Sequence, residues 1–387
     1  MIARVDTLLT FFTHPAGMRR LDCLDGLRGL LALYVLLGHM APFAPLPGWL
    51  QFTVSHGEAA VDLFFVISGL VIVQSRGRSG GQVAPFLITR AARIFPVFLP
   101  AFAVSVLIQP LSCGFERMPW LAWDNPAHSI CVSGWPRHWG MEIIAHLTMT
   151  HGLFPHAALP DAWVSFLGSA WSLSTEWQFY VLALLVRDRN RLVGLLLALA
   201  GAGALWRLAG PEAWQFSRAF LPNQGQFFAL GVASVAVVLR EPGAARRLGV
   251  VLAATVAICA SHGAVGKLLP PLAWAACLAA QVGMQGAAPN LIRHVLRHPV
   301  STYLGAISYC VYLVNEPIHK ACGGLLARLA DNDAALFTAL WIPAAIGLPV
   351  MAAAALHTWL ETPALRRGRA AAAMRASRPV QSGGSGL

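Results

Sequence analysis

The feature that most constrains this chain is a series of long apolar stretches, separated by loops that carry arginines. A helix that crosses the hydrocarbon core of a bilayer needs about twenty mostly apolar residues. The chain of 387 residues is 57% hydrophobic and 12% charged, whereas a soluble globular domain carries about 25% charged residues. A water-soluble fold could not bury so much apolar surface. The sequence therefore predicts an all-α, polytopic membrane helix bundle.

About ten stretches meet this requirement, although glycine or proline interrupts several of them. They are 24–46, 59–75, 92–111, 168–186, 191–208, 219–239, 247–262, 268–287, 302–327 and 334–360. The apolar stretch 141–155 is too short to cross a bilayer and is expected to be re-entrant or interfacial. We predict three parts: an N-terminal segment 1–23, a membrane domain 24–365 with a long external loop at about 112–165, and a disordered tail 366–387.

The distribution of basic residues sets the expected orientation. Alternate loops carry twenty and seven Lys and Arg residues, and the remaining one, Arg28, lies inside the first stretch. Cytoplasmic loops carry the excess of Lys and Arg in membrane proteins. We therefore expect both termini in the cytoplasm. The net charge of +11 is spread over short clusters between apolar stretches, so we expect no nucleic-acid partner.

The seven cysteines contain no C-x-x-C pair, and the histidines near the long loop lack metal-ligand spacing, so we expect no metal site. Cys113 and Cys131 both lie in that loop. They pair if the loop faces an oxidising compartment, and otherwise they remain two free thiols. The tryptophans of the loop suit either stacking on sugar rings or an aromatic belt at the membrane interface. They are Trp120, Trp123, Trp135 and Trp139.

The first apolar stretch, "LDGLRGLLALYVLLGHM", keeps two ionisable side chains, Arg28 and His39. Ionisable residues in a membrane helix cost roughly 2.5–3.5 kcal/mol each near its centre and usually mark function. An interval of eleven residues places the two on one face of a helix, about 16 Å apart along its axis. The alternatives are a snorkelling anchor for Arg28 and a helix-packing hydrogen bond for His39.

The next two stretches add a carboxylate and a pair of cations. Asp62 interrupts "VDLFFVISGLVI" and is placed to orient His39, or else to serve as the structural partner of an arginine. Arg90 and Arg93 in "ITRAARIFP" are three residues apart and project from one side of a helix. Paired arginines at the boundary between membrane and cytoplasm suit phosphate binding, and the alternative is ordinary anchoring.

Two further blocks carry polar side chains at helical spacing. In "SAWSLSTEWQFY", Ser172, Glu176 and Tyr180 share a face, and Glu176 is a candidate base or positioning group. In "ISYCVYLVNEPIHK", Tyr309, Tyr312 and Glu316 lie along one side with Asn315 adjacent. We expect the first of these blocks to give Ser172, and the second Tyr309, Tyr312 and Asn315, as substrate-binding residues.

Taken in order, these blocks resemble the acyltransferase-3 family of integral-membrane enzymes. The blocks "LDGLRGLLALYVLLGHM", "VDLFFVISGLVI", "TRAARIFPVF", "WSLSTEWQFY" and, more loosely, "ISYCVYLVNEPI" span 24–318. Many members carry a histidine where Asn315 stands. Some members append a hydrolase-like domain at the C-terminus, and we expect none here because the chain ends soon after the tenth stretch.

The resemblance implies an acyl-CoA donor, most often acetyl-CoA, used as a co-substrate with no tightly bound cofactor. It also implies a hydroxyl of an extracytoplasmic or lipid-linked glycan as acceptor, and a multi-pass protein of the bacterial inner membrane. Arg28, Arg90 and Arg93 would then hold the phosphates of CoA, and the thioester would reach His39. His39 would act as general base or as acyl-accepting nucleophile, with Glu176 and Asp62 orienting it or the acceptor.

Two other classes of protein are compatible with the composition. A transporter or flippase for a glycan or lipid precursor would also be polytopic with a few buried charges. It would have no evident use for the spacing between Arg28 and His39 or for the boundary arginines. A non-catalytic assembly protein on the same scaffold is the third reading, which replacement of His39 would separate from the enzyme.

Overall fold

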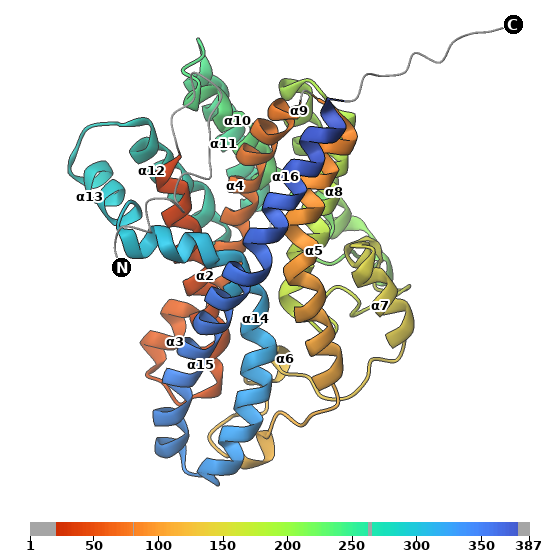
Figure 1. Cartoon of the computed structure of the whole chain (residues 1–387), viewed down its shortest axis with the longest axis vertical. Coiled ribbons are helices and arrows are strands. Elements are labelled where there is room, and N and C mark those ends of the chain that lie inside the picture. Colours follow the sequence, from red (N-terminus) through yellow and green to blue (C-terminus); the bar gives the residue numbers. More distant parts are fainter. Residues whose placement is uncertain (1–20, 80, 262–264, 378–387) are drawn as a thin grey trace, which may run out of the picture.

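The computed structural model describes residues 21–79, 81–261 and 265–377. The fold is 78% helical, and the described residues contain no strand, only an isolated bridge between Pro155 and Phe216. Figure 1 shows α5, α14, α15 and α16 running roughly along the long axis of the molecule. The all-α prediction is confirmed for the described part of the chain.

Each of the ten predicted stretches overlaps a helix. The ten helices are α2 (Asp22–Met40), α4 (Gly57–Arg78), α5 (Val83–Ile108), α8 (Trp171–Leu185), α9 (Arg189–Ala209), α10 (Gly225–Val238), α11 (Ala244–Ala260), α12 (Leu269–Val282), α14 (Pro299–Ala330) and α15 (Ala334–Leu356). Within the described residues, five segments are long and apolar enough to cross a membrane. They are Asp22–Phe43, Gly48–Gly77, Val83–Ile108, Arg189–Ala209 and Ala334–Ala376. The helices α8, α10, α11 and α12 have only 14 to 17 residues, and α14 is also not among the candidate spans, so ten predicted stretches form helices but the number of ten spans stays a prediction.

The other helices lie between these or follow α15. They are α3 (Gly48–Val54), α6 (Ala127–Ile130), α7 (Trp139–Leu147), α13 (Ala287–Leu296) and α16 (Thr362–Ala376), with a π-helical turn over His357–Glu361. The stretch 141–155 does not cross the bundle, because its helix α7 is only nine residues long. The exposed apolar side chains of Met141 and Ile144 on α7 fit the interfacial placement expected for that stretch.

The bundle has two ends, which we name by their residues. At the arginine end, Arg76 of α4 donates hydrogen bonds to the carbonyls of Ala183, Val186 and Arg187, and so ties α4 to the end of α8. At the disulfide end, Cys113 and Cys131 form a disulfide with their Cα atoms 6.1 Å apart. The structure thus takes the paired alternative for these two cysteines.

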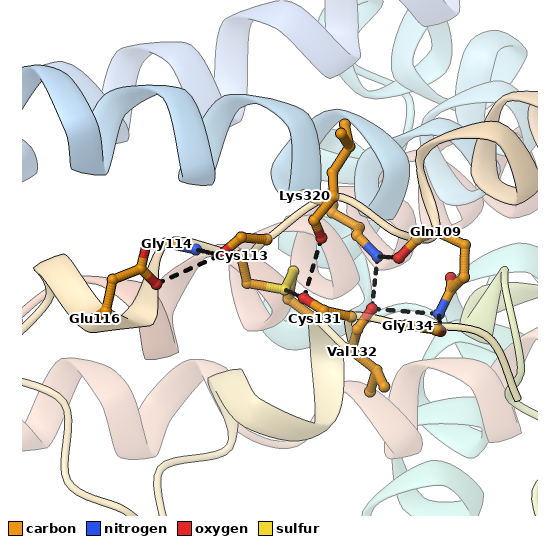
Figure 2. The surroundings of a disulfide bond; sticks show 11 residues. Gln109, Cys113, Gly114, Glu116, Cys131, Val132, Gly134 and Lys320 are labelled. Carbon is orange, nitrogen blue, oxygen red and sulfur yellow. Dashed lines mark hydrogen bonds between the residues drawn. A yellow bond between two sulfur atoms is a disulfide. The ribbon is translucent and has the colours of Figure 1, made fainter.

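Figure 2 shows how the disulfide loop is fixed to the bundle. Lys320 of α14 donates hydrogen bonds to the carbonyls of Gln109 (2.9 Å) and Val132 (2.5 Å), which flank the two cysteines in sequence. The side chain of Gln109 donates to Gly134 O at 2.9 Å. The loop is therefore held on α14, the helix that also supplies residues to the site described below.

Helices α2 and α14 cross in close backbone contact. A Cβ atom added to Gly305 would lie 1.9 Å from the carbonyl oxygen of Asp25, and one on Gly29 would lie 2.5 Å from Gly305 N. Small residues at such a crossing let two backbones touch, which is how helices pack when no water drives them together. The close crossing fixes the rotation of α2 and hence the directions of Arg28 and His39.

The predicted disordered tail, 366–387, includes residues that are helical in the structure. Residues 366–376 belong to α16, which packs along α5 so closely that a Cβ on Gly368 would lie 2.3 Å from the Cβ of Ala92. The prediction of disorder is wrong for these residues, because the alanine-rich segment "RRGRAAAAMRA" has high helix propensity and finds a partner. Residues 378–387 and 1–20 lie outside the described part of the chain.

Candidate active site

His39 lies in the last turn of α2, which runs from the arginine end toward the disulfide end. Its ring nitrogen Nδ1 lies 2.7 Å from the Oδ1 atom of Asn315 on α14. The amide nitrogen of Asn315 already donates to the carbonyls of Val311 (3.0 Å) and Tyr312 (2.7 Å), so Oδ1 is the atom that accepts from His39. Nδ1 therefore carries a proton, and in the neutral ring the lone pair lies on Nε2. A histidine in this tautomer can take a proton at Nε2.

Glu316, the residue after Asn315, lies on the same side of the imidazole. Its Oε1 atom is 3.7 Å from His39 Nδ1, and its Oε2 atom accepts a hydrogen bond of 2.8 Å from the backbone N–H of Ser169. Gly168 makes room for it, because a Cβ there would lie 3.1 Å from the carboxylate. A carboxylate at this position stabilises an imidazolium if His39 becomes protonated. The sequence pattern placed Glu316 on the face of α14 without giving it this role.

Two of the predicted substrate-binding residues lie beside this group. The hydroxyls of Ser172 and Tyr312 are hydrogen-bonded to each other at 3.0 Å, and Ser172 Oγ also donates to Ser169 O at 3.4 Å. Tyr312 is also tied to Asn315, whose side-chain amide donates to the Tyr312 carbonyl at 2.7 Å. Tyr309 lies elsewhere: its hydroxyl donates to Ile94 O at 2.7 Å, and its ring lies under the guanidinium of Arg93.

The three predicted phosphate-binding arginines gather toward the arginine end. The guanidinium of Arg28 is within electrostatic range of Arg93, and Arg90 is within range of Arg93 in turn. Arg90 donates to the hydroxyl of Ser75 at 3.1 Å, and its guanidinium lies 5.9 Å from the centre of the Phe86 ring. The structure therefore joins residues of α2 and α5 into one cationic cluster, as the sequence predicts.

Glu361 is the residue of this cluster that sequence reasoning missed. It is fully buried and forms an ion pair with Arg93. Its second oxygen accepts from His357 Nδ1 at 2.8 Å and from Cys310 Sγ at 3.3 Å. Glu361 ends the π-helical turn, a local distortion that often occurs at functional sites. The carboxylate offsets part of the positive charge that Arg28, Arg90 and Arg93 bring together.

The two carboxylates predicted to assist His39 lie in different surroundings. Asp62 is buried and pairs with Lys267, with Oδ2 and Nζ 2.9 Å apart. Glu176 accepts a hydrogen bond of 2.6 Å from Tyr180 and lies within electrostatic range of Arg28 and Arg90. Within the described residues, the hydrogen bond and the ion pair of the His39 side chain go to Asn315 and Glu316 instead. Glu176 thus lies with the arginine cluster, whereas Asp62 forms a separate ion pair with Lys267.

Comparison with known proteins assigns this arrangement to a family. The family model described as "Acyltransferase domain" matches residues 21–359, which include α2 through most of the π-helical turn. A protein of Rhizobium radiobacter, "Protein 2 in picA locus", is 35% identical over 92 residues. That match covers 22% of this chain and 44% of the relative, so the chain spans less than half of the length of that protein. No solved structure matches.

The family match extends over nearly all of the described helices. It includes the residues around His39 and those of the arginine cluster, except Glu361. The residues that carry the resemblance in sequence, Arg28, His39, Arg90, Arg93 and Glu176, all fall inside it. The apolar helices of the bundle agree with a membrane enzyme. The chain therefore belongs to the acyltransferase-3 family of membrane acyltransferases.

Proposed function

We propose that this protein is an integral-membrane O-acyltransferase. It moves an acyl group, by preference acetyl, from cytoplasmic acyl-CoA to a hydroxyl of an extracytoplasmic or lipid-linked glycan. In this proposal it is a multi-pass protein of the bacterial inner membrane with both termini in the cytoplasm. The arginine end then faces the cytoplasm and the disulfide end faces the oxidising side, in agreement with the distribution of Lys and Arg.

The observation that carries the proposal is the placement of two kinds of side chain on one helix. Arg28 at the start of α2 joins a cationic cluster, and His39, eleven residues later, has a free Nε2. The rise of a helix separates them by about 16 Å along its axis. CoA has phosphates at one end and a thioester at the end of a long pantetheine arm. Arg28, Arg90 and Arg93 would hold the phosphates while the thioester reaches His39.

The surroundings of His39 favour a role as general base. Nε2 would take the proton of the acceptor hydroxyl as its oxygen attacks the thioester carbonyl, and the leaving thiolate of CoA would recover that proton. Asn315 holds the ring by its Nδ1–H, and Glu316 stabilises the imidazolium that forms between the two steps. In the nucleophilic alternative, Nε2 attacks the thioester first and passes the acyl group on from an acyl-imidazole.

The acceptor would approach from the disulfide end, next to the hydroxyls of Ser172 and Tyr312. Hydroxyl pairs of this kind can exchange their mutual hydrogen bond for bonds to a sugar. Glu176 would contribute at the donor side, where it lies close to the arginines. The proposal asks Asp62 only for its ion pair with Lys267, which holds α4 to the segment before α12.

The experiment that tests the proposal combines a donor assay with an analysis of products. Purified protein in vesicles is given acetyl-CoA labelled in the acetyl group, and surface glycans of cells with and without the gene are compared by mass spectrometry. We expect an added acetyl mass that disappears with His39→Ala. His156→Ala, which changes an exposed loop histidine, is the matched control and should retain activity. Unchanged glycan acylation in His39→Ala cells would contradict the enzyme assignment, and solute transport without acyl transfer would favour a transporter.

A further inference from the structure

Two adjoining cavities lie at the arginine end, away from the candidate active site. They have volumes of about 290 and 380 Å3 and share Arg293 and Arg297. Gly26 of α2 lies against Leu296 of α13, so closely that a Cβ on it would be 1.8 Å from the Leu296 carbonyl oxygen. Arg28 is two residues further on, about 200° around the helix. The cavities and the donor arginines are therefore on opposite sides of α2.

The walls of these cavities are basic. Arg240, Gln281 and Gln285 complete the polar lining of the first cavity, and His294 and His298 line the second, with no carboxylate among the described residues that line either. Arg293 is held in place by the carbonyls of Ala280 (3.1 Å) and Met284 (3.0 Å). These bonds orient its guanidinium without neutralising it.

Two other arginines at the same end are neutralised by one carboxylate. Arg189 and Arg247 share the carboxylate of Glu241, at 2.5 and 3.2 Å. Among the described residues, neither Arg240 nor Arg297 forms an ion pair with a carboxylate. Arg240 and Arg297 thus line the cavities without a carboxylate partner among the described residues, whereas Arg189 and Arg247 lie outside the cavities and are paired.

The backbone at Arg240 supports a use for its side chain. Arg240 follows the end of α10 with φ of 57°, a left-handed conformation that favours glycine. The corresponding turn at the end of α12 has Gly283, with φ of 86°. An arginine at a position where glycine is preferred lowers the stability of the turn, and Arg240 places its guanidinium at the first cavity in spite of that cost.

The helix beside the cavities has the character of an interfacial helix. On α13, Leu291 and Val295 are four residues apart and expose 64% and 42% of their surface, whereas Arg293 and Arg297 lie on another face. A short helix with one apolar and one basic face lies in the plane of the membrane interface. Basic pockets at the ends of spanning helices bind anionic headgroups.

We propose that these cavities form a binding site for the phosphodiester headgroup of an anionic phospholipid of the inner leaflet. Arg240 and Arg297 bind the phosphate, because a guanidinium fork matches two phosphate oxygens. The acyl chains lie over the exposed apolar surface of Leu291 and Val295. The site is independent of the donor and acceptor sites and requires no acyl transfer.

Lipid-dependent thermal stabilisation of the purified full-length protein tests the proposal. The unfolding midpoint is measured in neutral detergent with increasing dioleoylphosphatidylglycerol, and dioleoylphosphatidylcholine is the neutral comparison. Arg240→Gly removes the guanidinium while relieving the left-handed turn, so it folds at least as well as the wild type. Arg240→Lys keeps a charge there, and Arg246→Ala removes an exposed arginine from the same end without touching the cavities.

The anionic lipid should raise the midpoint of the wild type and of Arg246→Ala alike, and the neutral lipid should not. Arg240→Gly should need about fivefold more phosphatidylglycerol for the same shift, since each basic residue near an anionic lipid contributes about 1 kcal/mol. The phosphatidylglycerol concentration that Arg240→Lys needs should lie between those of the wild type and Arg240→Gly. An equal response of Arg240→Gly and wild type would overturn the site. A shift given by inorganic phosphate or acetyl-CoA and lost in Arg240→Gly would overturn the lipid as its occupant.

Discussion

The two ends of α2 differ in how their polar groups are balanced. Near the start of the helix, Arg28 joins two other arginines and nearby carboxylates, of which Glu361 is fully buried and pairs with Arg93. Near its last turn, His39 is held by a neutral amide, and one ring nitrogen is left free. A cluster of guanidinium groups suits the binding of a polyanion, whereas an oriented imidazole suits proton transfer. The difference indicates that donor binding and chemistry are separate tasks of one helix.

The largest expected effect of a single change that leaves His39 in place is at Asn315. Replacement by leucine removes the acceptor that fixes the proton on Nδ1, so the imidazole would populate both tautomers and rotate. Outer partners of a functional histidine typically contribute 10- to 100-fold to activity. We expect the rate of acetyl transfer to fall about 100-fold in Asn315→Leu.

Asn315→His serves as the control for that change, because a histidine can again accept from His39 and should restore part of the rate. Both rates are measured with labelled acetyl-CoA at saturating concentration. Equal rates for wild type and Asn315→Leu would mean that His39 needs no orienting partner. That result would contradict the role proposed for the His39 end of α2.

Glu361 tests the other end of the helix. Glu361→Gln leaves Arg93 without its buried counter-charge, and breaking a buried pair costs about 3–5 kcal/mol. We expect the free energy of unfolding to fall by about 3 kcal/mol, measured by denaturation in mixed micelles. Glu58→Gln breaks partly exposed pairs with Arg218 and Lys267 and should cost less, about 1 kcal/mol. Equal losses in the two variants would show that the cationic cluster does not depend on Glu361.

A smaller effect concerns the support of Glu316 at the His39 end. His146 and His151 stack at 4.1 Å between ring centres, and His151 Nε2 donates to the carbonyl of Ala170, next to the Ser169 N–H that holds Glu316. Burial lowers the pKa of His151 from 6.5 to about 4 and that of His146 well below its usual value. Both rings are therefore neutral in the folded protein.

The pKa of His151 is lower in the folded protein than in the unfolded chain. Its neutral form therefore contributes fully to the free energy of unfolding above pH 6.5, and this contribution is lost as the pH falls toward 4. For His151 alone, linkage gives a loss of roughly 2 kcal/mol between pH 7 and pH 5. Thermal unfolding against pH measures this slope, and His151→Phe should flatten it. An unchanged slope in that variant would assign the acid sensitivity to other groups.

The helices could be predicted because their signal is local. An apolar stretch becomes a helix in a membrane whatever it packs against, and each of the ten predicted stretches overlaps one. The pairing of Arg28 with the arginines of α5 also follows from their common end of the bundle. The tail could not be read in the same way: composition suggested disorder for 366–376, but packing of Gly368 against Ala92 completes a helix there.

The partners of the site residues could not be predicted, because they depend on distant packing. Asp62 meets Lys267, 205 residues away, and no spacing rule relates the two. Glu361 reaches Arg93 only because a π-helical turn rotates it toward α5, and sequence patterns based on 3.6 residues per turn do not show such a turn. Glu316 carried a usable signal, since it adjoins Asn315 on the face of α14 that includes Tyr309 and Tyr312.

The most direct test of donor binding at one end of α2 and chemistry at the other is to shorten the donor. Acetyl-CoA and acetyl-pantetheine, which has the thioester but no phosphates, are compared in wild type, Arg28→Gln and His39→Ala. A lost hydrogen bond to a charged group is worth about 1.5–3 kcal/mol, so Arg28→Gln should lower kcat/KM for acetyl-CoA at least tenfold. It should leave acetyl-pantetheine unaffected, whereas His39→Ala should abolish transfer from both donors. If Arg28→Gln lowers kcat/KM by the same factor for acetyl-CoA and for acetyl-pantetheine, the result contradicts donor binding at the arginine end.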